Sequence, residues 1–260
     1  MNKLYFLSFL YIFFGCGFSS GLYQDILTAQ NLLEEQKFDK AAVLYEKILK
    51  RKPSKSIDIK ISFQLGEIYS IYLERYDKSL YYFNKIISDS SSPLWEVKAL
   101  EKVGYINFEN LKNYKKSAEV YKRLINFRPI LANIDTYKFK YAVSLFKKSK
   151  YDQSKIKFKE ILLSNNQNLA KESIYYLALI DFYRHNWNDS IKNFKKYLVL
   201  ESQKNKIVKT KFMIANAYES ASKLKEAYNI YYSLIGEYPN PKVIRNRLNS
   251  LYKRRVSRKR

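Results

Sequence analysis

The chain has 260 residues and carries 48 lysine and arginine residues against 24 aspartate and glutamate residues, a formal net charge of +24 at pH 7. Its single cysteine, Cys16, and single histidine, His185, exclude an intramolecular disulfide, a thiolate zinc cluster and a histidine metal site. The sequence holds no glycine-rich phosphate loop and no His-Glu-x-x-His or Gly-x-Ser-x-Gly motif, so we expect no metal, no cofactor and no catalytic residue.

The positive charge is spread over the whole chain, and two interpretations of it stay open. One is a solvated coat in a composition rich in lysine, asparagine, isoleucine and tyrosine. The other is a surface that attracts anionic lipid headgroups, cell-wall polymers or nucleic acid. No sequence-reading nucleic-acid motif accompanies the charge, so we expect no nucleic-acid partner.

Residues 1–20 read MNKLYFLSFLYIFFGCGFSS and have the pattern of a secretion signal. Lys3 supplies one positive charge, an uncharged apolar run follows from Leu4 to Phe14, and small residues come next. The run has about eleven residues, whereas a span of the hydrocarbon core needs about twenty. We therefore expect a signal peptide over residues 1–15.

The end of this run resembles the lipobox of bacterial lipoproteins, because Gly15 stands directly before Cys16. The two phenylalanines before them stand where that motif usually has a leucine and a small residue. The resemblance implies a lipidated Cys16 with residues 16–21 as a tether, and a membrane-anchored lipoprotein of the cell envelope that faces the periplasm. Two alternatives stay open, namely cleavage near Ser19 without lipidation and an uncleaved or cytoplasmic segment.

Residues 22–239 repeat one helical hairpin, which is clearest in the stretch from Val208 to Pro239. A small residue in the second helix marks each copy: Ala41, Ser79, Ser117, Ser154, Ser190 and Ala227. Another small residue precedes each marker by 12 or 13 positions: Ala29, Gly66, Gly104, Ala142, Ala178 and Ala215. Three positions before the marker stand Phe38, Tyr76, Tyr114, Tyr151, Trp187 and Leu224. An aromatic residue follows the marker by 4 positions: Tyr45, Phe83, Tyr121, Phe158, Phe194 and Tyr231. A period in the mid-thirties with a helical pattern inside it predicts a stacked helical solenoid.

The pattern predicts an all-α protein and indicates where each helix begins and ends. The first helices of the hairpins are expected over residues 22–35, 58–73, 96–110, 135–148, 171–185 and 208–222. The second helices are expected over residues 38–51, 76–89, 114–127, 151–164, 187–201 and 224–237. We expect one elongated domain whose most flexible point is the connector at residues 90–93.

The end of the chain is expected to have two parts. An apolar stripe on the basic stretch 240–252 predicts a helix that caps the last hairpin, because a solenoid must cover its terminal face. Residues 253–260 are expected to be a basic tail that packs against nothing. It is either a disordered, solubilising end or a contact to an anionic membrane or another polyanion. Its positive residues are Lys253, Arg254, Arg255, Arg258, Lys259 and Arg260.

These residues make the chain resemble the tetratricopeptide repeat family over about residues 22 to 239. One copy matches the family through Ala142, Tyr151, Ser154 and Phe158, and another through Ala215, Leu224, Ala227, Tyr231 and Pro239. The resemblance implies a right-handed α-solenoid of about six hairpins with a capping helix, and a binding protein rather than an enzyme. The copies are two to four residues longer than the usual unit of about 34 residues, and serine replaces alanine at four markers.

In that family the first helices line a concave surface, so the resemblance implies a partner-binding groove on their free face. The implied residues are aromatic with one exception: Phe63, Tyr105, Phe108, Phe139, Phe146, Tyr175, Phe182, Tyr183, Phe212 and Asn216. Aromatic side chains suit the capture of an extended segment or a helix. The other interpretation is that many of them are core between neighbouring repeats. Phe139 and Phe212 stand where chaperone-binding members carry a lysine and asparagine clamp, so we do not expect that clamp here.

We therefore expect a non-enzymatic scaffold that binds other envelope proteins in its groove and reaches the membrane through its lipid anchor. Its layout is similar to that of the tetratricopeptide lipoprotein of the outer-membrane-protein assembly machine, which implies a part in an envelope or outer-membrane assembly complex. The basic tail would contact anionic lipid or the cell wall. The alternatives are a soluble periplasmic coordinator of cell-wall synthesis or division, and a cytoplasmic adaptor if the N-terminus is not a signal.

Overall fold

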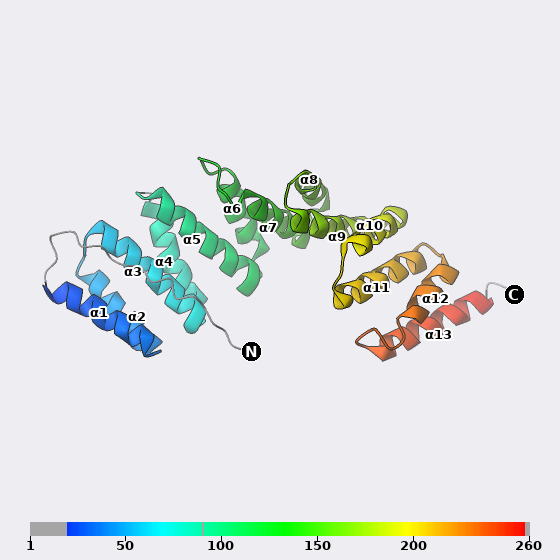
Figure 1. Cartoon of the computed structure of the whole chain (residues 1–260), viewed down its shortest axis with the longest axis horizontal. Helices are drawn as coiled ribbons and strands as arrows, with labels where there is room; N and C mark the ends of the chain where they lie inside the picture. Colours follow the sequence, from blue (N-terminus) through cyan, green and yellow to red (C-terminus); the bar gives the residue numbers. More distant parts are fainter. Residues whose placement is uncertain (1–19, 90, 258–260) are drawn as a thin grey trace. The chain divides into compact units, whose positions relative to one another are not determined.

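The computed structural model describes residues 20–89 and 91–257, and Figure 1 shows the order of their helices along the chain. Over these residues the structure contains α-helices and two short π-helical segments, and no β-strand. None of the helices in this part of the chain is long and apolar enough to cross a membrane. The chain divides into two compact units, Met1–Ala99 and Leu100–Arg260, which are described separately.

The first unit holds two hairpins of antiparallel helices and the beginning of a third. Its elements are α1 (Ser20–Glu34), α2 (Phe38–Lys50), α3 (Lys55–Glu67), the π-helical segment η1 (Ile68–Tyr72), α4 (Tyr76–Asp89) and the first half of α5 (Pro93–Tyr105). Helix α1 packs against α2, and α3 packs against α4. Tyr45, Ile48 and Leu65 lie in the core between them. α5 begins at a proline, whose missing N–H costs nothing in the first turn of a helix.

The second unit continues the same arrangement and ends with a single helix. After α5 its elements are the π-helical segment η2 (Ile106–Asn110), α6 (Tyr114–Ile125), α7 (Ile134–Lys147), α8 (Tyr151–Ile161), α9 (Gln167–Tyr183), α10 (Trp187–Leu200), α11 (Lys204–Ser220), α12 (Leu224–Ser233) and α13 (Pro241–Ser257). Each helix from α6 onward packs against the next one in the chain, and α7 also packs against α9. This succession of neighbours is an all-α helical repeat, which confirms the predicted fold class.

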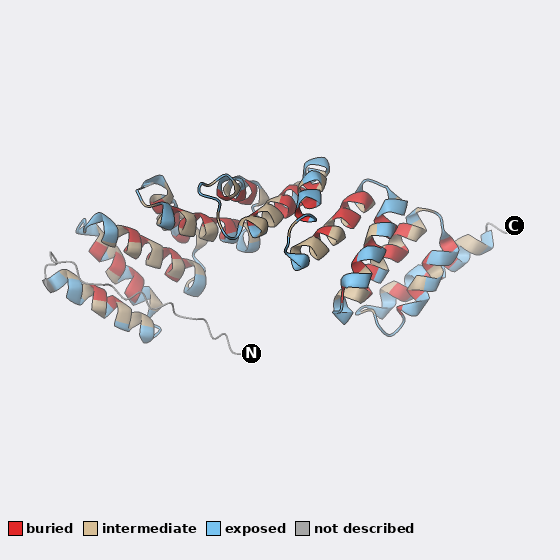
Figure 2. Cartoon of the chain, turned by 45° about the horizontal axis from the view of Figure 1, so that its top comes forward, coloured by how far each residue is buried: buried red, intermediate tan, exposed pale blue. Residues whose placement is uncertain are grey.

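The repeated positions are the ones that the structure buries. All six marker residues are fully buried, and the aromatic residues that follow them by 4 positions are buried. Figure 2 shows buried residues along the sides of the helices that face their neighbours, with exposed residues on the outer sides. The periodicity of the sequence therefore records which side of each helix packs against the adjoining helices.

The serine markers have a specific role in this packing. Ser154 donates a hydrogen bond of 2.9 Å from its hydroxyl to the carbonyl oxygen of Ala142, and Ser190 donates one of 2.9 Å to that of Ala178. In each case the serine on the second helix bonds to the small residue on the first helix of the same hairpin. A serine hydroxyl can be buried at such a crossing because its hydrogen bond is made.

The two π-helical segments coincide with the two copies that carry an extra residue. The small residue of the first helix precedes its marker by 13 positions in these copies, at Gly66 and Gly104, and by 12 in the other four. The extra residue is taken up by the wider turns η1 and η2, in which the N–H of Leu73 bonds to Ile68 and that of Leu111 to Ile106. A π-helical turn accommodates one residue more than an α-helical turn, so the hairpins keep the same buried positions.

The turn inside every hairpin has one residue with a left-handed backbone. It stands five positions before the marker in all six copies, with φ between 52° and 61°: Gln36, Glu74, Lys112, Ser149, His185 and Ser222. The lone histidine is one of these turn residues, and its ring packs edge-on against Trp187 at 5.0 Å. His185 therefore has a structural place in the turn.

The C-terminal helix is longer than predicted, and part of the expected tail is packed. α13 continues to Ser257 instead of ending near residue 252. Arg254 forms an ion pair of 2.9 Å with Glu219, and the guanidinium of Arg255 lies 5.7 Å from the centre of the Tyr228 ring. The expectation that the tail packs against nothing is wrong for these two residues, because both lie on the side of α13 that faces α11 and α12. Arg258, Lys259 and Arg260 lie outside the described residues.

Candidate functional site

The predicted groove residue of the first unit is part of a packed aromatic cluster. Phe63 in α3 is half-buried and packs edge-on against Phe83 at 5.3 Å and against Trp95 at 5.2 Å. Its position therefore agrees better with core than with an open binding face.

The other nine predicted residues lie in the second unit, and most of them are also packed. They stand on the first helices of their hairpins: Tyr105 on α5, Phe108 on η2, Phe139 and Phe146 on α7, Tyr175, Phe182 and Tyr183 on α9, and Phe212 and Asn216 on α11. Phe146 is only 8% exposed and belongs to a core cluster. Only Tyr105 and Tyr183 among them are exposed, each to 52%. The structure thus divides the predicted set into a supporting core and two exposed rings.

Tyr183 is held in place by neighbouring aromatic rings. Its ring stacks on that of Tyr151, with centres 5.8 Å apart and planes 1° from parallel. Phe146 contacts it from α7 at 5.8 Å, and Phe182 contacts it edge-on at 5.9 Å. An exposed ring with this support loses little conformational freedom when it binds a partner.

The surroundings of Tyr105 are different, because a lysine lies next to it. The ammonium group of Lys140 in α7 lies 5.4 Å from the centre of the Tyr105 ring, 5.0 Å from that of Phe108 and 5.9 Å from that of Tyr121. It also forms an ion pair of 3.4 Å with Glu109. These contacts fix the lysine against the aromatic face through cation–π attraction.

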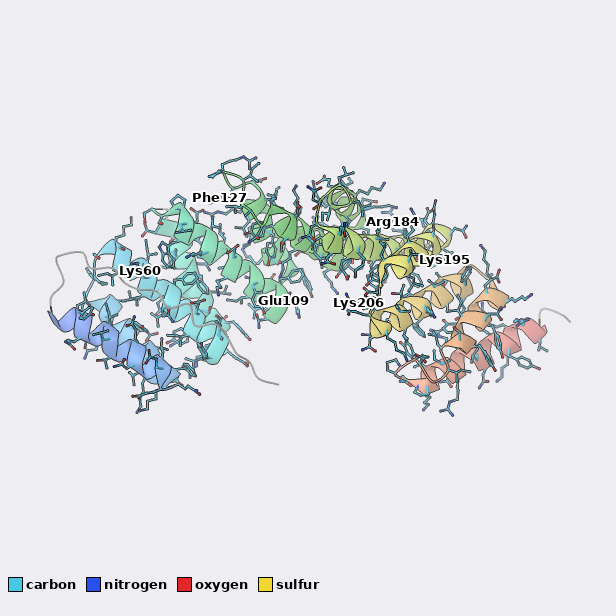
Figure 3. The ribbon with its side chains drawn as sticks, in the orientation of Figure 1. Lys60, Glu109, Phe127, Arg184, Lys195 and Lys206 are labelled. Carbon is cyan, nitrogen blue, oxygen red and sulfur yellow. The ribbon has the colours of Figure 1, made fainter. Side chains whose placement is uncertain are left out.

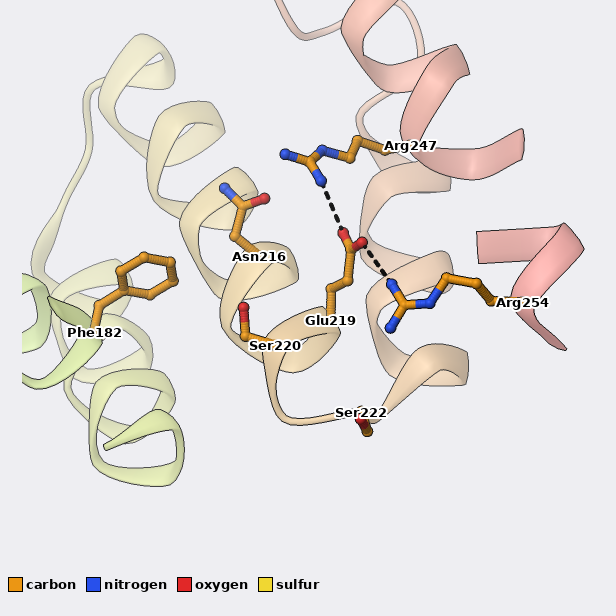
Figure 4. A pocket seen from close by; sticks show the side chains of 7 residues that line it. All are labelled: Phe182, Asn216, Glu219, Ser220, Ser222, Arg247 and Arg254. Carbon is orange, nitrogen blue, oxygen red and sulfur yellow. Dashed lines mark hydrogen bonds and ion pairs between the residues drawn. The ribbon is translucent and has the colours of Figure 1, made fainter. Parts of the chain in front are cut away.

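A pocket of about 370 Å³ lies where α9, α11 and α13 come together in the second unit. Figure 4 shows its seven lining side chains, with Glu219 between the two arginines of α13. The lining residues are Phe182, Asn216, Glu219, Ser220, Ser222, Arg247 and Arg254. Phe182 and Asn216 belong to the predicted groove, so the pocket adjoins that set of residues. The arginines of the capping helix complete it.

Glu219 organises the charge in this pocket. Its carboxylate is 2.9 Å from Arg254 and 3.6 Å from Arg247, and it accepts a hydrogen bond of 3.3 Å from the hydroxyl of Tyr231. The Tyr231 hydroxyl is also within hydrogen-bonding distance of the side-chain oxygen of Asn216. Burial, followed by the charge of Glu219, raises the pKa of Tyr231 well above its usual value of 10. This hydroxyl therefore stays protonated over the physiological range.

The sequence holds one signal of this pocket. Arg247 and Arg254 are seven residues apart, which places them on one side of a helix. The apolar stripe predicts a helix that ends at residue 252, which places Arg254 in the tail. No sequence pattern distinguishes Glu219, since a carboxylate at the end of a first helix is usually a surface residue.

A second acidic residue that the sequence did not reveal, Glu201, joins three helices. Its buried carboxylate accepts hydrogen bonds from the backbone N–H groups of Ser202 and Gln203 and from the hydroxyl of Tyr197. Two lysines lie close to it, Lys171 at 3.1 Å and Lys206 at 3.7 Å. Figure 3 labels Lys206 on α11. The backbone N–H of Gln203, then the hydroxyl of Tyr197 and the ammonium group of Lys171, lower the pKa of Glu201 to about 2. These contacts make Glu201 a structural junction between α9, α10 and α11.

Residues 20–89 and 91–257 contain no group of three or more His, Cys, Asp or Glu side chains that could hold a metal ion. The lipidation site predicted at Cys16 lies outside the described residues. The candidate site consists of two features, the exposed rings of Tyr105 and Tyr183 with their supporting core and the pocket beside α13.

Known proteins share the fold of this chain, and one family model matches part of its sequence. Residues 210–241 match the model of the tetratricopeptide repeat family. No curated protein matches the sequence. A tetratricopeptide repeat protein from Parabacteroides merdae has a similar structure, with a TM-score of 0.63, 14% identity, and coverage of 92% of this chain and 93% of that chain.

Two further solved structures are similar. PilW, described as a widely conserved type IV pilus biogenesis factor, has a TM-score of 0.55, 16% identity, and coverage of 90% of this chain and 100% of that chain. YrrB, described as a tetratricopeptide repeat protein with an unusual peptide-binding site, has a TM-score of 0.53, 15% identity, and coverage of 68% and 84%. The chain thus has the fold of tetratricopeptide repeat proteins, and residues 210–241 carry the sequence pattern of that family.

Proposed function

We propose that the chain is a non-enzymatic scaffold that binds other proteins through the first-helix face of its second unit. One observation carries the proposal. The ring of Tyr183 is half exposed, yet it packs against the rings of Tyr151, Phe146 and Phe182. Protein interfaces concentrate their binding energy in such aromatic residues, because a fixed ring offers a large contact area at a small entropic cost. The likeness to YrrB, whose structure is described as having a peptide-binding site, supports the same class of function.

We also propose that the protein is located in the cell envelope. Residues 1–16 have the pattern of a lipoprotein signal, and a lipid on Cys16 would anchor the scaffold to a membrane of the cell envelope, facing the periplasm. The description of PilW as a pilus biogenesis factor supports a part in assembling an envelope structure. A soluble periplasmic coordinator of cell-wall synthesis or division is the second candidate. This candidate differs from the anchored scaffold because Cys16 would carry no lipid.

The binding face can be tested by site-specific photo-crosslinking in cells. A photoreactive phenylalanine analogue is placed at Tyr183 in one strain and at Tyr232 in another. Tyr232 is 61% exposed, but it lies on α12, a second helix. The proposal expects discrete crosslinked proteins from position 183 and none of them from position 232. The same products in equal yield from both positions would show that the first-helix face is not the binding surface.

The anchor is tested separately by metabolic labelling with a tagged fatty acid. The wild-type chain is expected to take up the label and to fractionate with membranes, whereas Cys16→Ala is expected to do neither. A wild-type chain that is exported but unlabelled would favour the soluble coordinator. A chain that stays in the cytosol would show that residues 1–15 are not a signal.

A further inference from the structure

The most exposed large apolar side chains among the described residues lie at or after the ends of second helices in the second unit. Leu163 is 88% exposed, Val199 is 85% exposed and Ile130 is 68% exposed. Leu163 stands two residues after the end of α8, Val199 lies in the last turn of α10, and Ile130 lies in the connector after α6. Leu200 and Ile235, at the ends of α10 and α12, are also exposed. Single exposed apolar residues are common on protein surfaces, but here they recur at one structural position.

These positions share one edge of the second unit, where each second helix leads into the next first helix. The two helices of a hairpin are antiparallel, so the connectors between hairpins lie at the opposite end from the turns inside them. Figure 1 shows α11 and α13 beginning on one side, and the turn from α11 to α12 on the other. We define the connector edge as the surface formed by Leu163, Val199, Leu200 and Ile235.

Lysines accompany the apolar side chains of the connector edge. Lys159 precedes Leu163 by four positions, and Lys195 precedes Val199 by the same number. Residues four apart lie on one side of a helix, so each lysine is next to an exposed apolar side chain. Lys196 follows directly in the sequence. All three lysines are exposed, and none of them forms an ion pair with the residues that the structure describes.

The acidic residues near the connector edge do not balance these lysines. Within five positions of the ends of α8, α10 and α12 stand Glu160, Glu201 and Glu237. Glu160 is paired with Lys157 at 2.7 Å, and Glu237 is paired with Lys204 at 2.8 Å. The side chain of Glu201 is buried in its junction. The connector edge therefore combines exposed apolar side chains with an uncompensated positive charge.

We propose that the connector edge lies on the surface of a lipid bilayer that contains anionic phospholipid. This contact goes beyond the proposed scaffold function and is separate from a lipid on Cys16. The side chains of Leu163 and Val199 enter the boundary between headgroups and acyl chains, as the apolar face of an interfacial helix does. The stems of Lys159 and Lys196 are apolar, so their ammonium groups reach the lipid phosphates from the same depth.

The composition of the connector edge favours lipid over protein as its partner. Protein interfaces are enriched in aromatic residues and arginine and are depleted of lysine. The connector edge has the opposite composition, with aliphatic side chains beside lysines. A second copy of the chain that used the same edge would bring like charges together, which costs binding energy. An anionic bilayer supplies both an apolar layer and the negative charge that the edge lacks.

The test compares an environment-sensitive fluorophore at two positions of the full-length chain in a Cys16→Ala background. One sample carries the dye at Leu163→Cys and the other at Leu111→Cys. Leu111 is also exposed, but it lies in the turn before α6, at the opposite edge of the unit. Phosphatidylcholine vesicles that contain phosphatidylglycerol are expected to shift the emission to shorter wavelength at position 163 and not at position 111. Both samples share residues 1–20, so a contact of that segment with the vesicles affects both.

Matched variants connect the emission shift at position 163 to the apolar side chains. Val199→Gln is expected to raise the lipid concentration at half-shift by up to about tenfold, because less apolar surface leaves water. Leu111→Gln makes the same kind of change at the opposite edge and is expected to alter this concentration less than about twofold. Circular dichroism of each variant would verify that the fold is unchanged.

A second pair of variants tests the charge. Lys159→Gln combined with Lys196→Gln is expected to reduce the preference for anionic vesicles by about tenfold or more, since each lysine near the surface contributes to the attraction. Lys147→Gln combined with Lys150→Gln removes the same charge at the turn between α7 and α8. This control pair is expected to reduce the preference less than about threefold, because its ammonium groups lie farther from the lipid than a Debye length of about 8 Å.

Three results would overturn the inference. The first is an equal shift, or no shift, at positions 163 and 111. The second is an equal loss in the two lysine pairs, which would mean that the overall charge attracts the vesicles. The third is a shift at position 163 that appears only with a protein fraction, which would make the partner a protein. None of these results bears on crosslinking at Tyr183, so this inference and the scaffold proposal can fail separately.

Discussion

Ser79 in α4 donates a hydrogen bond of 2.7 Å from its hydroxyl to the backbone carbonyl oxygen of Gly66 in α3. Both residues are buried where the two helices cross. The equivalent bond recurs in later hairpins, from Ser154 to Ala142 and from Ser190 to Ala178. The replacement of alanine by serine at these markers thus adds one polar contact to each crossing without enlarging the side chain beyond what the crossing admits.

Removing one of these bonds should weaken the second unit. We expect Ser190→Ala to lower the free energy of unfolding by about 1 kcal/mol, because the buried hydrogen bond to Ala178 is lost while packing is nearly unchanged. Thermal and urea unfolding followed by circular dichroism would measure the change. Ser250→Ala on the exposed side of α13 serves as the control and should be neutral or slightly stabilising. A Ser190→Ala chain as stable as the control would show that the bond contributes nothing.

Residue 66 is glycine because the ring of Phe83 leaves no room for a side chain there. A Cβ atom at residue 66 would lie 2.6 Å from that ring, whereas one at Gly104 would lie 3.1 Å from the ring of Tyr121. Alanine gains about 1 kcal/mol over glycine in a helix interior, and overpacking costs about 1–3 kcal/mol. We therefore expect Gly66→Ala to destabilise the first unit by up to about 2 kcal/mol and Gly104→Ala to change stability by less than about 1 kcal/mol. Urea unfolding of both variants would check the ranking, and equal effects would contradict it.

The hairpins could be predicted from the sequence because burial sets their periodicity. The marker and the aromatic residue four positions after it, such as Ser154 and Phe158, recur at the spacing of one helix face. The π-helical segments were not predicted, although the spacing of 13 residues between Gly66 and Ser79 was visible. A longer spacing lengthens either the turn or the helix, and periodicity alone does not distinguish these outcomes.

The candidate site was predicted less well, because first-helix residues face either a partner or the next repeat. The spacing of Phe146 and Tyr183 does not show that Phe146 is buried and Tyr183 exposed. The pocket depends on how far α13 extends, since Arg254 reaches Glu219 only from a helix that continues past residue 252. A basic stretch with a single apolar residue, Val256, has no periodicity that would indicate this continuation.

The left-handed turn residues offer a stabilising substitution. Ser149 has φ of 56°, a conformation that costs a residue with a Cβ atom about 1 kcal/mol. We expect Ser149→Gly to raise the free energy of unfolding by up to about 1 kcal/mol, because glycine adopts this conformation without the steric cost. Ser149→Ala keeps the Cβ atom and should bring no gain. Thermal unfolding of the two variants would measure the difference, and an equal result for both would contradict the assignment of the cost to backbone conformation.

The junction at Glu201 predicts how the second unit responds to acid. The pKa of Glu201 is lowered from its usual 4.5 to about 2, first by the backbone N–H of Gln203, then by the Tyr197 hydroxyl and by Lys171. A carboxyl whose pKa is lower in the folded chain than in the unfolded chain stabilises the fold above the unfolded value. That contribution is lost as the pH falls from about 4.5 toward about 2. Acid should therefore weaken the packing of α9, α10 and α11.

Comparison of wild type with Glu201→Gln isolates this contribution from that of the other carboxylates. At pH 7 the variant should be less stable by about 3 kcal/mol, since it exchanges charge-assisted hydrogen bonds for weaker ones beside Lys171 and Lys206. The difference should be largest at and above pH 4.5 and should shrink as the pH approaches 2. Urea unfolding followed by the fluorescence of Trp187 in a Trp95→Phe background would measure it in the second unit, with Glu226→Gln, an exposed change on α12, as the control. A difference that stays constant between pH 7 and pH 2 would show that the pKa of Glu201 is the same in the folded and the unfolded chain.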